Sequence, residues 1–327
     1  MSQIKVTVLS AEEIQSLVSL DEVVNLTQEV YRRVGEGKID CPTKISVPLP
    51  GNDEKNMHWI NAMPAVLKDD KIVGMKWVNV TSANRHRSLP VTMGTIILND
   101  IETALPLAIL DGTWITHVRT GASVAVGAKL LSREDSHTVT IIGAGSEGRS
   151  SLEAIAKVRN IRKVNVVDIS KDVAGEYVKT ESQKVRADFE IFDNAEKGVA
   201  GSDMIILTTT SRKPIMKFAW AKKGQFVCTI SCMTDLDNAF IEGSDKFILD
   251  STHCSLSRIS AMAGLEVCED NVYADICQIA SGKFKGREND QELITYAPAG
   301  MGAVDVAVAH LAYKKAIKVG VGSQVSL

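Results

Sequence analysis

Three closely spaced glycines could hold a phosphate-containing ligand. The turn that contains them is Gly143, Ala144, Gly145, Ser146, Glu147 and Gly148, a G-x-G-x-x-G. It follows an apolar, β-branched run at 138–142 and precedes an amphipathic segment at 149–158. The first glycine permits a tight turn, the second lets the backbone approach a pyrophosphate, and the third lets helix pack on strand. The sequence therefore predicts a dinucleotide site at the start of this helix.

A carboxylate follows at the distance that ribose binding requires. A second predicted strand, 163–167, leads into Asp168, which lies 20 residues after Gly148. An acid at this offset bonds the adenosine ribose and repels a 2′-phosphate, so it favours NAD(H) over NADP(H). Lys171 nearby weakens that preference. In the alternative interpretation, the segment is an ordinary α/β crossover in which Asp168 only caps the helix predicted over 171–185.

Composition excludes several function classes. The 327 residues include 37 Lys and Arg against 40 Asp and Glu, a net charge of −3. No basic stretch is interleaved with aromatic residues, so neither nucleic acid nor a membrane surface is an expected partner. The first residues lack a basic head followed by an apolar core, and no apolar run is long enough to span a bilayer. We therefore expect a cytoplasmic protein. The sequence also contains no metal-binding motif, so no metal site is expected.

The elements that position these residues follow from hydrophobic patterning. Ser19 and Glu22 form a predicted capping box before an N-terminal helix, and 41–111 has the texture of β-strands and turns. One long helix is predicted over 112–131 and another over 304–319. Beyond Asp168, further strands are predicted at 189–192, 203–207, 225–230 and 246–249. Strands that alternate with helices at this spacing predict a doubly wound parallel sheet.

Several ordered signatures coincide with one known family. They are Met63-Pro64-Ala65, Gly74 to Asn79, Gly94 to Asp100, Pro106-Leu107-Ala108, Ile115-Thr116, Arg119-Thr120, the glycine-rich turn, Thr208-Thr209-Thr210, and Gly300-Met301-Gly302 with Asp305. On these residues the chain resembles the ornithine cyclodeaminase/mu-crystallin family over essentially its whole length. The short loop Ser231–Asp237, with Gly286-Arg287-Glu288, looks more like the opine-type dehydrogenase branch of that family.

The resemblance implies an α/β fold with two domains. A Rossmann-type doubly wound parallel sheet over 116–302 would bind NAD, with Thr208, Thr209 and Met301 as further cofactor contacts. A discontinuous α+β domain, 1–115 with 303–327, would bind an amino-acid or keto-acid substrate and form a homodimer. The substrate residues that the resemblance implies are Lys76, Arg119 and Lys44.

Elementary chemistry supports two of these roles. Arg119 offers the planar, bidentate donor that an α-carboxylate needs, although it could instead be a helix-surface charge in a salt bridge. Lys76 lies in an apolar strand, where burial would lower its pKa toward a value useful for proton transfer. The alternative for Lys76 is a side chain that reaches the surface. Lys44 could face solvent as readily as a ligand.

Two expected carboxylates are missing. The resemblance implies an Asp just after the strand at 225–230 and a Glu before the Met-Pro, but this chain has Met233 and Asn61 there. Asp235 could bend into the site, or it could cap the helix that begins near Asn238. Cyclisation of ornithine is therefore less favoured than simple redox chemistry.

Three functions remain open from the sequence. The first is an NAD(H)-dependent oxidoreductase, transferring hydride at the C–N bond of an α-amino acid, an opine-like N-substituted amino acid or a ketimine. The second is an ornithine cyclodeaminase, which would release ammonia from ornithine without net NADH formation. The third is a crystallin-like protein that binds nucleotide or ligand without turnover, because a fold does not fix a function.

Overall fold

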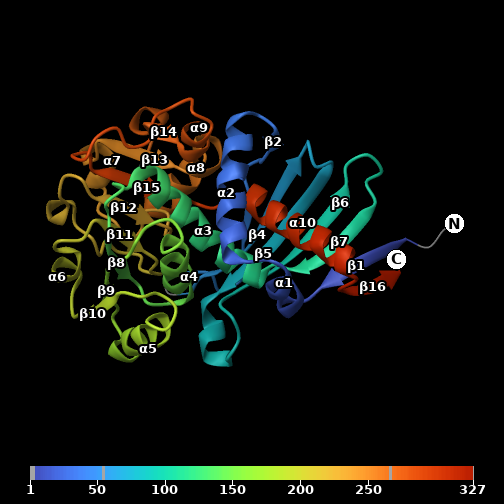
Figure 1. Cartoon of the computed structure of the whole chain (residues 1–327), viewed down its shortest axis with the longest axis horizontal. Coiled ribbons are helices and arrows are strands. Elements are labelled where there is room, and N and C mark those ends of the chain that lie inside the picture. Colours follow the sequence, from blue (N-terminus) through green and yellow to red (C-terminus); the bar gives the residue numbers. More distant parts are fainter. Residues whose placement is uncertain (1–3, 54–55, 265–266, 327) are drawn as a thin grey trace. The chain divides into compact units, whose positions relative to one another are not determined.

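The computed structural model describes residues 4–53, 56–264 and 267–326. The sequence predicts no targeting signal at the start of the chain, and residues 1–3 of that segment lie outside the described residues. The chain divides into two compact units, residues 1–119 with 301–327 and residues 120–300. Most of their helices and strands are labelled in Figure 1. The predicted roles of substrate-binding and dimerisation domain (1–115 with 303–327) and NAD-binding domain (116–302) stay predictions.

The first unit is built on an eight-stranded mixed sheet. Its order is β16-β1-β7-β6-β5-β4-β2, with β3 also paired to β4. The strands are β1 (Lys5–Leu9), β2 (Ile39–Asp40), β3 (Ile45–Pro48), β4 (His58–Leu67), β5 (Ile72–Thr81), β6 (Thr92–Asp100), β7 (Pro106–Asp111) and β16 (Ser323–Ser326). A short 3₁₀ helix, η1 (Ser82–Arg87), follows β5. The predicted β texture of 41–111 is thus confirmed, and β16 is an addition that the sequence did not predict.

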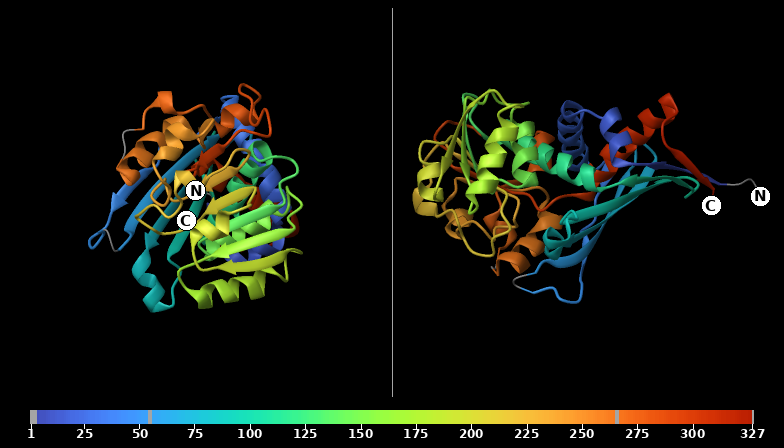
Figure 2. Two further views of the ribbon diagram at one scale, coloured as in Figure 1. Left: turned by 90° about the vertical axis from the view of Figure 1, so that its left-hand side faces the viewer. Right: turned by 90° about the horizontal axis from the view of Figure 1, so that it is seen from below.

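Helices cover one face of this sheet. They are α1 (Ala11–Leu17), α2 (Leu20–Gly35) and α10 (Gly302–Val319), and Figure 2 shows them on the same side of the strands. The predicted capping box is confirmed, because Ser19 Oγ accepts from the Glu22 N–H while the Glu22 carboxylate accepts from the Ser19 N–H. A Cβ on Gly74 would lie 2.9 Å from Val306 of α10. Glycine at this position therefore lets α10 lie close to β5.

Among the described residues of this unit, no helix covers the opposite face of the sheet (Figure 2), and the centre of that face is apolar. Successive side chains on a strand point to opposite faces, so residues that alternate with the helix-facing Gly74 and Lys76 point away from α10. One such row crosses four strands at Pro64, Met75, Ile97 and Ile109, which are register partners. These side chains are half-buried, and neighbouring Trp77 is 44% exposed.

The second unit is an eight-stranded sheet in which every pair is parallel. Its order is β10-β9-β8-β11-β12-β15-β13-β14. The strands are β8 (Thr138–Ile142), β9 (Lys163–Val167), β10 (Asp188–Phe192), β11 (Met204–Leu207), β12 (Phe226–Thr229), β13 (Lys246–Leu249), β14 (Ala274–Asp275) and β15 (Ile294–Ala297). The sequence predicted the first six. It missed β14 and also β15, which lies between β12 and β13.

Helices cover both faces of this sheet, as a doubly wound fold requires. They are α3 (Thr113–Leu131), which begins in the first unit, α4 (Ser146–Ile155), α5 (Lys171–Glu181), α6 (Ala195–Val199), α7 (Ala239–Gly243), α8 (Thr252–Ala263) and α9 (Ile276–Ala280), with 3₁₀ helices η2 (Phe218–Trp220) and η3 (Glu269–Asn271). On β8, Thr140 Oγ1 donates to Gly198 O of α6, whereas a Cβ on Gly148 of α4 would lie 3.1 Å from neighbouring Ile141. Since neighbouring residues on a strand point to opposite faces, α4 and α6 lie on opposite sides, and the Rossmann-type prediction is confirmed.

Several helix boundaries differ from the prediction by one to four residues. Helix α4 begins at Ser146 rather than at 149, so Ser146 and Glu147 belong to its first turn. Helix α5 ends at Glu181 rather than at 185. Among the described residues, no helix is both long enough and apolar enough to cross a membrane.

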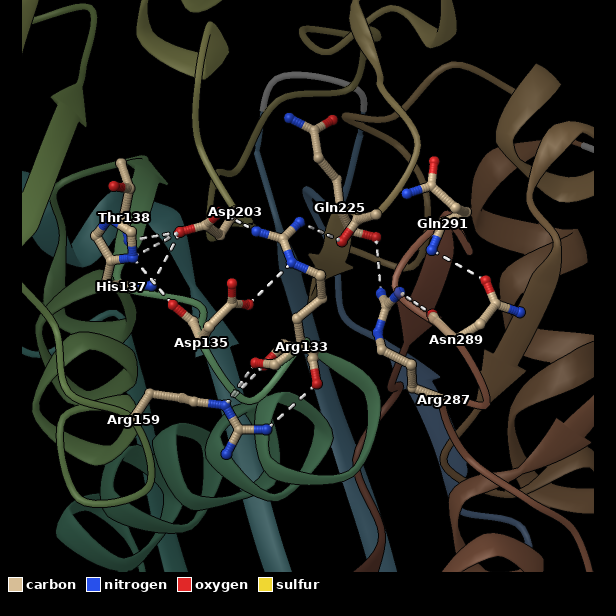
Figure 3. A network of polar contacts seen from close by, with 12 residues as sticks. Arg133, Asp135, His137, Thr138, Arg159, Asp203, Gln225, Arg287, Asn289 and Gln291 are labelled. Atoms are coloured by element: carbon tan, nitrogen blue, oxygen red, sulfur yellow. Dashed lines mark hydrogen bonds and ion pairs between the residues drawn. The ribbon is translucent and has the colours of Figure 1, made fainter.

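Arginine side chains bind the carboxyl end of α3, and Figure 3 shows two of them, Arg159 and Arg287, in the wider polar network around Arg133. Arg159 donates to the carbonyl oxygens of Ala128, Lys129 and Ser132 in and just after the last turn of the helix, where carbonyls begin to lack intrahelical partners. Arg287 donates to Leu131 O. This end of the helix, with few intrahelical partners for its carbonyls, is thus fixed by two guanidinium groups.

Candidate functional site

The glycine-rich turn lies between β8 and α4. Gly143 has φ +99°, in the left-handed region that residues with a side chain rarely adopt. A Cβ on Gly148 would lie 2.4 Å from Gly143 O, so only glycine lets α4 pack this close to the turn. Gly145 is the N-cap of α4, and a Cβ there would meet no described atom within 4 Å. The turn therefore fits the pyrophosphate of a dinucleotide, which would accept hydrogen bonds from the first N–H groups of α4.

Asp168 braces this turn from the end of β9. Its Oδ2 accepts a hydrogen bond from the Ala144 N–H at 2.8 Å, and its Oδ1 accepts from the Ser170 N–H at 2.9 Å. The side chain that caps α5 is Ser170, which accepts from the Val173 N–H. The alternative in which Asp168 caps this helix is therefore wrong, and its contact with ribose stays a prediction.

The two predicted threonines are held by the protein itself. Thr208 Oγ1 donates to Gly143 O at 2.7 Å, so it secures the glycine-rich turn. Thr209 Oγ1 donates to Asp235 Oδ2 at 2.8 Å. Both residues follow β11, and their contact with a cofactor stays a prediction.

A buried ionic cluster lies in the first unit. Lys76 of β5 and Arg119 of α3 both donate to Oδ1 of Asp305 on α10, at 2.6 Å from Lys76 Nζ and 2.9 Å from Arg119 Nε. Lys76 Nζ also lies 3.3 Å from Thr116 Oγ1. Lys76 and Asp305 are completely buried, and the Arg119 side chain is 11% exposed. The structure therefore brings Lys76 and Arg119 together around one carboxylate.

Burial decides the protonation of Lys76. It lowers the pKa of the Lys76 ammonium to about 7, with the nearby charges of Arg119 and Lys44 acting in the same direction and Asp305 opposing them. The predicted lowering is confirmed, and the alternative of a lysine that reaches the surface is wrong. The alternative of a surface salt bridge at Arg119 is wrong too, because its partner Asp305 is fully buried.

Lys44 and Met301 lie at the margins of this cluster. Lys44 is half-buried just before β3, where its charge acts on Lys76. Met301 is 2% exposed and immediately precedes α10, the helix that carries Asp305. The substrate role of Lys44 and the cofactor role of Met301 stay predictions.

Asp305 is the site residue that sequence reasoning did not assign. It belonged to a family signature without a role, although an acid within the apolar run Val304 to Ala309 was itself a signal. Its Oδ2 is buried and makes no hydrogen bond with the described residues. Both hydrogen bonds that Asp305 accepts from these two cations use Oδ1.

The residues at the missing carboxylate positions have other tasks. Met233 is 1% exposed and packs in the core of the second unit with Leu236 and Phe240. Asn61 accepts a hydrogen bond from Ser46 Oγ at 2.5 Å. Asp235 does not cap α7, since its carboxylate accepts hydrogen bonds from hydroxyl groups, so that alternative is wrong.

Several known proteins share this fold and part of this sequence. The model of the ornithine cyclodeaminase/mu-crystallin family matches residues 4–320. Alanine dehydrogenase of Archaeoglobus fulgidus is 32% identical over 97% of both chains. The structure of Thermococcus litoralis Delta(1)-pyrroline-2-carboxylate reductase with NADH and L-proline has a TM-score of 0.89 and 31% identity, covering 98% of this chain and 100% of that one. An archaeal alanine dehydrogenase dimer with bound NAD gives a TM-score of 0.88 and 30% identity, with 98% and 99% covered.

Proposed function

The chain belongs to the ornithine cyclodeaminase/mu-crystallin family, and from that premise we propose that it is an NAD(H)-dependent oxidoreductase. Its substrate is an α-amino acid, an opine-like N-substituted amino acid or the corresponding ketimine, and it acts at the C–N bond. One observation carries this proposal: the buried Lys76, whose pKa lies at about 7, is held by Asp305 beside Arg119. Such a lysine can both hold and release a proton near neutral pH.

The cofactor is NAD(H) rather than NADP(H). The turn from Gly143 to Gly148 holds the pyrophosphate and Asp168 the adenosine ribose, and the further contacts are Thr208, Thr209 and Met301. When bound, the nicotinamide supplies or accepts the hydride. The Asp168 carboxylate repels the extra phosphate of NADP(H).

Arg119 and Lys76 have different tasks in this proposal. Arg119 binds the substrate carboxylate, with Lys44 adding positive charge, and thereby orients the carbon that exchanges hydride. Lys76 donates a proton from Nζ to the substrate nitrogen during reduction and removes one during oxidation. Asp305 keeps Nζ in place and opposes the loss of its proton.

Steady-state kinetics test these assignments. NADH absorbance is followed with amino acids, opines, and keto acids plus amines. We expect Arg119→Ala to raise KM about 10- to 100-fold, because the variant loses charge-assisted hydrogen bonds to the substrate carboxylate. Lys76→Met should lower kcat by a factor of about 10² to 10⁴. The matched control is Lys68→Met, since Lys68 is 46% exposed. Unchanged kinetics in both site variants would remove the proposed site.

Cofactor preference tests the role of Asp168. We expect tighter binding of NADH than of NADPH, and Asp168→Ala should narrow the difference. Because Asp168 also holds the Ala144 N–H, the variant should weaken NADH binding as well. A wild-type protein that prefers NADPH would contradict the ribose argument.

We also propose that the chain forms a homodimer through the uncovered apolar sheet face of the first unit. An unpaired apolar face of this kind is typical of an interface, and the archaeal alanine dehydrogenase structure is a dimer. Trp77→Glu should yield monomers in sedimentation velocity. Ile317→Glu is the control, because Ile317 is 56% exposed on α10, which covers the other face. Dimers in both variants would place the interface elsewhere.

A further inference from the structure

A fully buried carboxylate, Asp235, lies beyond the end of β12. Thr209 Oγ1 donates to its Oδ2 at 2.8 Å, Thr229 Oγ1 donates to its Oδ1 at 2.7 Å, and Ser231 Oγ also donates to Oδ1. We call Thr209, Thr229 and Ser231 the hydroxyl cage. Burial raises the pKa of the Asp235 carboxyl, and the hydrogen bonds from the cage oppose that rise. A carboxylate accepts without donating, so three O–H donors match it.

The hydroxyl cage joins the ends of two neighbouring strands. Thr209 lies two residues beyond β11, Thr229 is the last residue of β12, and Ser231 lies two residues further. Strands β11 and β12 are parallel partners, so these residues share the carboxyl edge of the sheet. Thr208, next to Thr209, donates to Gly143 O. The chain of contacts therefore runs from β12 through β11 to the glycine-rich turn after β8.

Asp168 supports the same edge from the other side. It follows β9 and accepts from the Ala144 N–H in the turn. In the sheet order β9-β8-β11-β12, Asp168 thus bonds the glycine-rich turn on one side and Thr208 on the other, with Asp235 one residue further through Thr209. Ligands of parallel sheets bind outside this edge. If the adenosine half of the dinucleotide lies on the β9 side of the turn, beside Asp168, then its nicotinamide half extends over the loops after β11 and β12.

The loop that contains Asp235 includes two residues in a backbone conformation that non-glycine residues rarely adopt. Cys232 and Met233 have φ values of 56° and 68°, two consecutive left-handed residues that are not glycine. Strain of this kind persists only where surrounding contacts impose it, and it gathers at ligand sites. Here the contacts are the buried Met233 side chain and Thr234 Oγ1, which donates to Ser211 O at 2.7 Å. The loop after β12 is therefore fastened to the loop after β11 at several points.

We propose that Asp235 is a positioning residue that holds the loops after β11 and β12 in the conformation that receives the nicotinamide half of the dinucleotide. This inference rests on the proposed function. Asp235 itself is enclosed and touches no ligand. Its effect passes through the hydroxyl cage, so loss of its charge should weaken binding of the nicotinamide half while sparing the adenosine half.

Two ligands separate these halves. NADH carries both, whereas ADP carries only the adenosine half, and their Kd values can be measured on the full chain by titration calorimetry. We expect Asp235→Asn to raise the Kd of NADH about tenfold or more, because the variant loses hydrogen bonds to a charged group. The Kd of ADP should rise less than about twofold. Thr229→Val should give the same selective loss, because Thr229 is fully buried and cannot itself contact a ligand.

Thr140→Val is the matched control. Thr140 is also a fully buried strand threonine, but its hydroxyl bonds Gly198 O of α6 rather than Asp235. Both Kd values should stay within about twofold of wild type. If Asp235→Asn does not fold, Thr229→Val decides. Equal weakening of NADH and ADP, or unchanged NADH binding, would overturn the role of Asp235. A wild-type chain that binds neither ligand would instead overturn the proposed function.

Discussion

The protonation of Lys76 should set the pH range of each reaction direction. Its pKa falls from the ordinary 10.5 to about 7, which corresponds to roughly 5 kcal/mol against the ammonium form. Reduction needs the ammonium as proton donor, so kcat/KM should fall about tenfold per pH unit above about 7. Oxidation needs the neutral amine, so kcat/KM should fall similarly below about 7.

The neighbours of Lys76 should move this inflection in opposite directions. Asp305 raises the pKa from 2.6 Å, and an opposite charge at such a distance is worth about 1–3 pKa units. Asp305→Asn should therefore shift the inflection to lower pH by that amount. Arg119→Gln removes a charge that lowers the pKa and should shift it upward.

The measurement is kcat/KM against pH in both reaction directions. Asp70→Asn is the matched control, because Asp70 pairs with Arg33 outside the cluster and should leave the inflection in place. A wild-type inflection near pH 10, or shifts of the same sign in Asp305→Asn and Arg119→Gln, would refute the assignment of Lys76 as the proton-transfer group.

Two further predictions concern stability and the turn. Gly148→Ala places a Cβ 2.4 Å from Gly143 O, so it should lower the free energy of unfolding by about 1–3 kcal/mol and abolish NADH binding. Gly175→Ala within α5 meets no described atom within 4 Å and should instead add about 0.5–1 kcal/mol. Arg159→Ala should lower the free energy of unfolding in urea by about 2–3 kcal/mol, since Arg159 caps α3. Exposed Arg162→Ala should change it by less than about 0.5 kcal/mol. Equal effects within either pair would contradict the packing and capping arguments.

The sequence predicted the strands and turns whose own residues carry a clear pattern. β8, β11 and β12 are short, mostly apolar runs, and the turn after β8 has the G-x-G-x-x-G spacing of a dinucleotide site. β16 has the polar sequence Ser323–Ser326 and is a strand only because it pairs with β1 from the other end of the chain. Such long-range pairing leaves no periodic signal in a segment of this length.

The same distinction holds for the site. Lys76 was conspicuous because a lysine interrupts an apolar strand, but its partner Asp305 is 229 residues away. Sequence shows that a buried charge needs a partner without showing which one. Asp235 was expected either in the site or at a helix cap. It was not expected in the hydroxyl cage, because Thr209 comes from another strand end, 26 residues earlier.

The departures from the family pattern favour simple redox chemistry over cyclisation. Reduction of a ketimine needs one hydride and one proton at the same C–N bond, and Lys76 with Asp305 can manage one proton. Cyclodeamination adds ring closure and ammonia loss, and each of these steps moves further protons. Met233 is buried and cannot titrate, Asn61 is an amide, and Asp235 is enclosed by hydroxyl groups. Incubation with ornithine and NAD should therefore release no ammonia in step with proline, and stoichiometric release of both would show that protons move by another route.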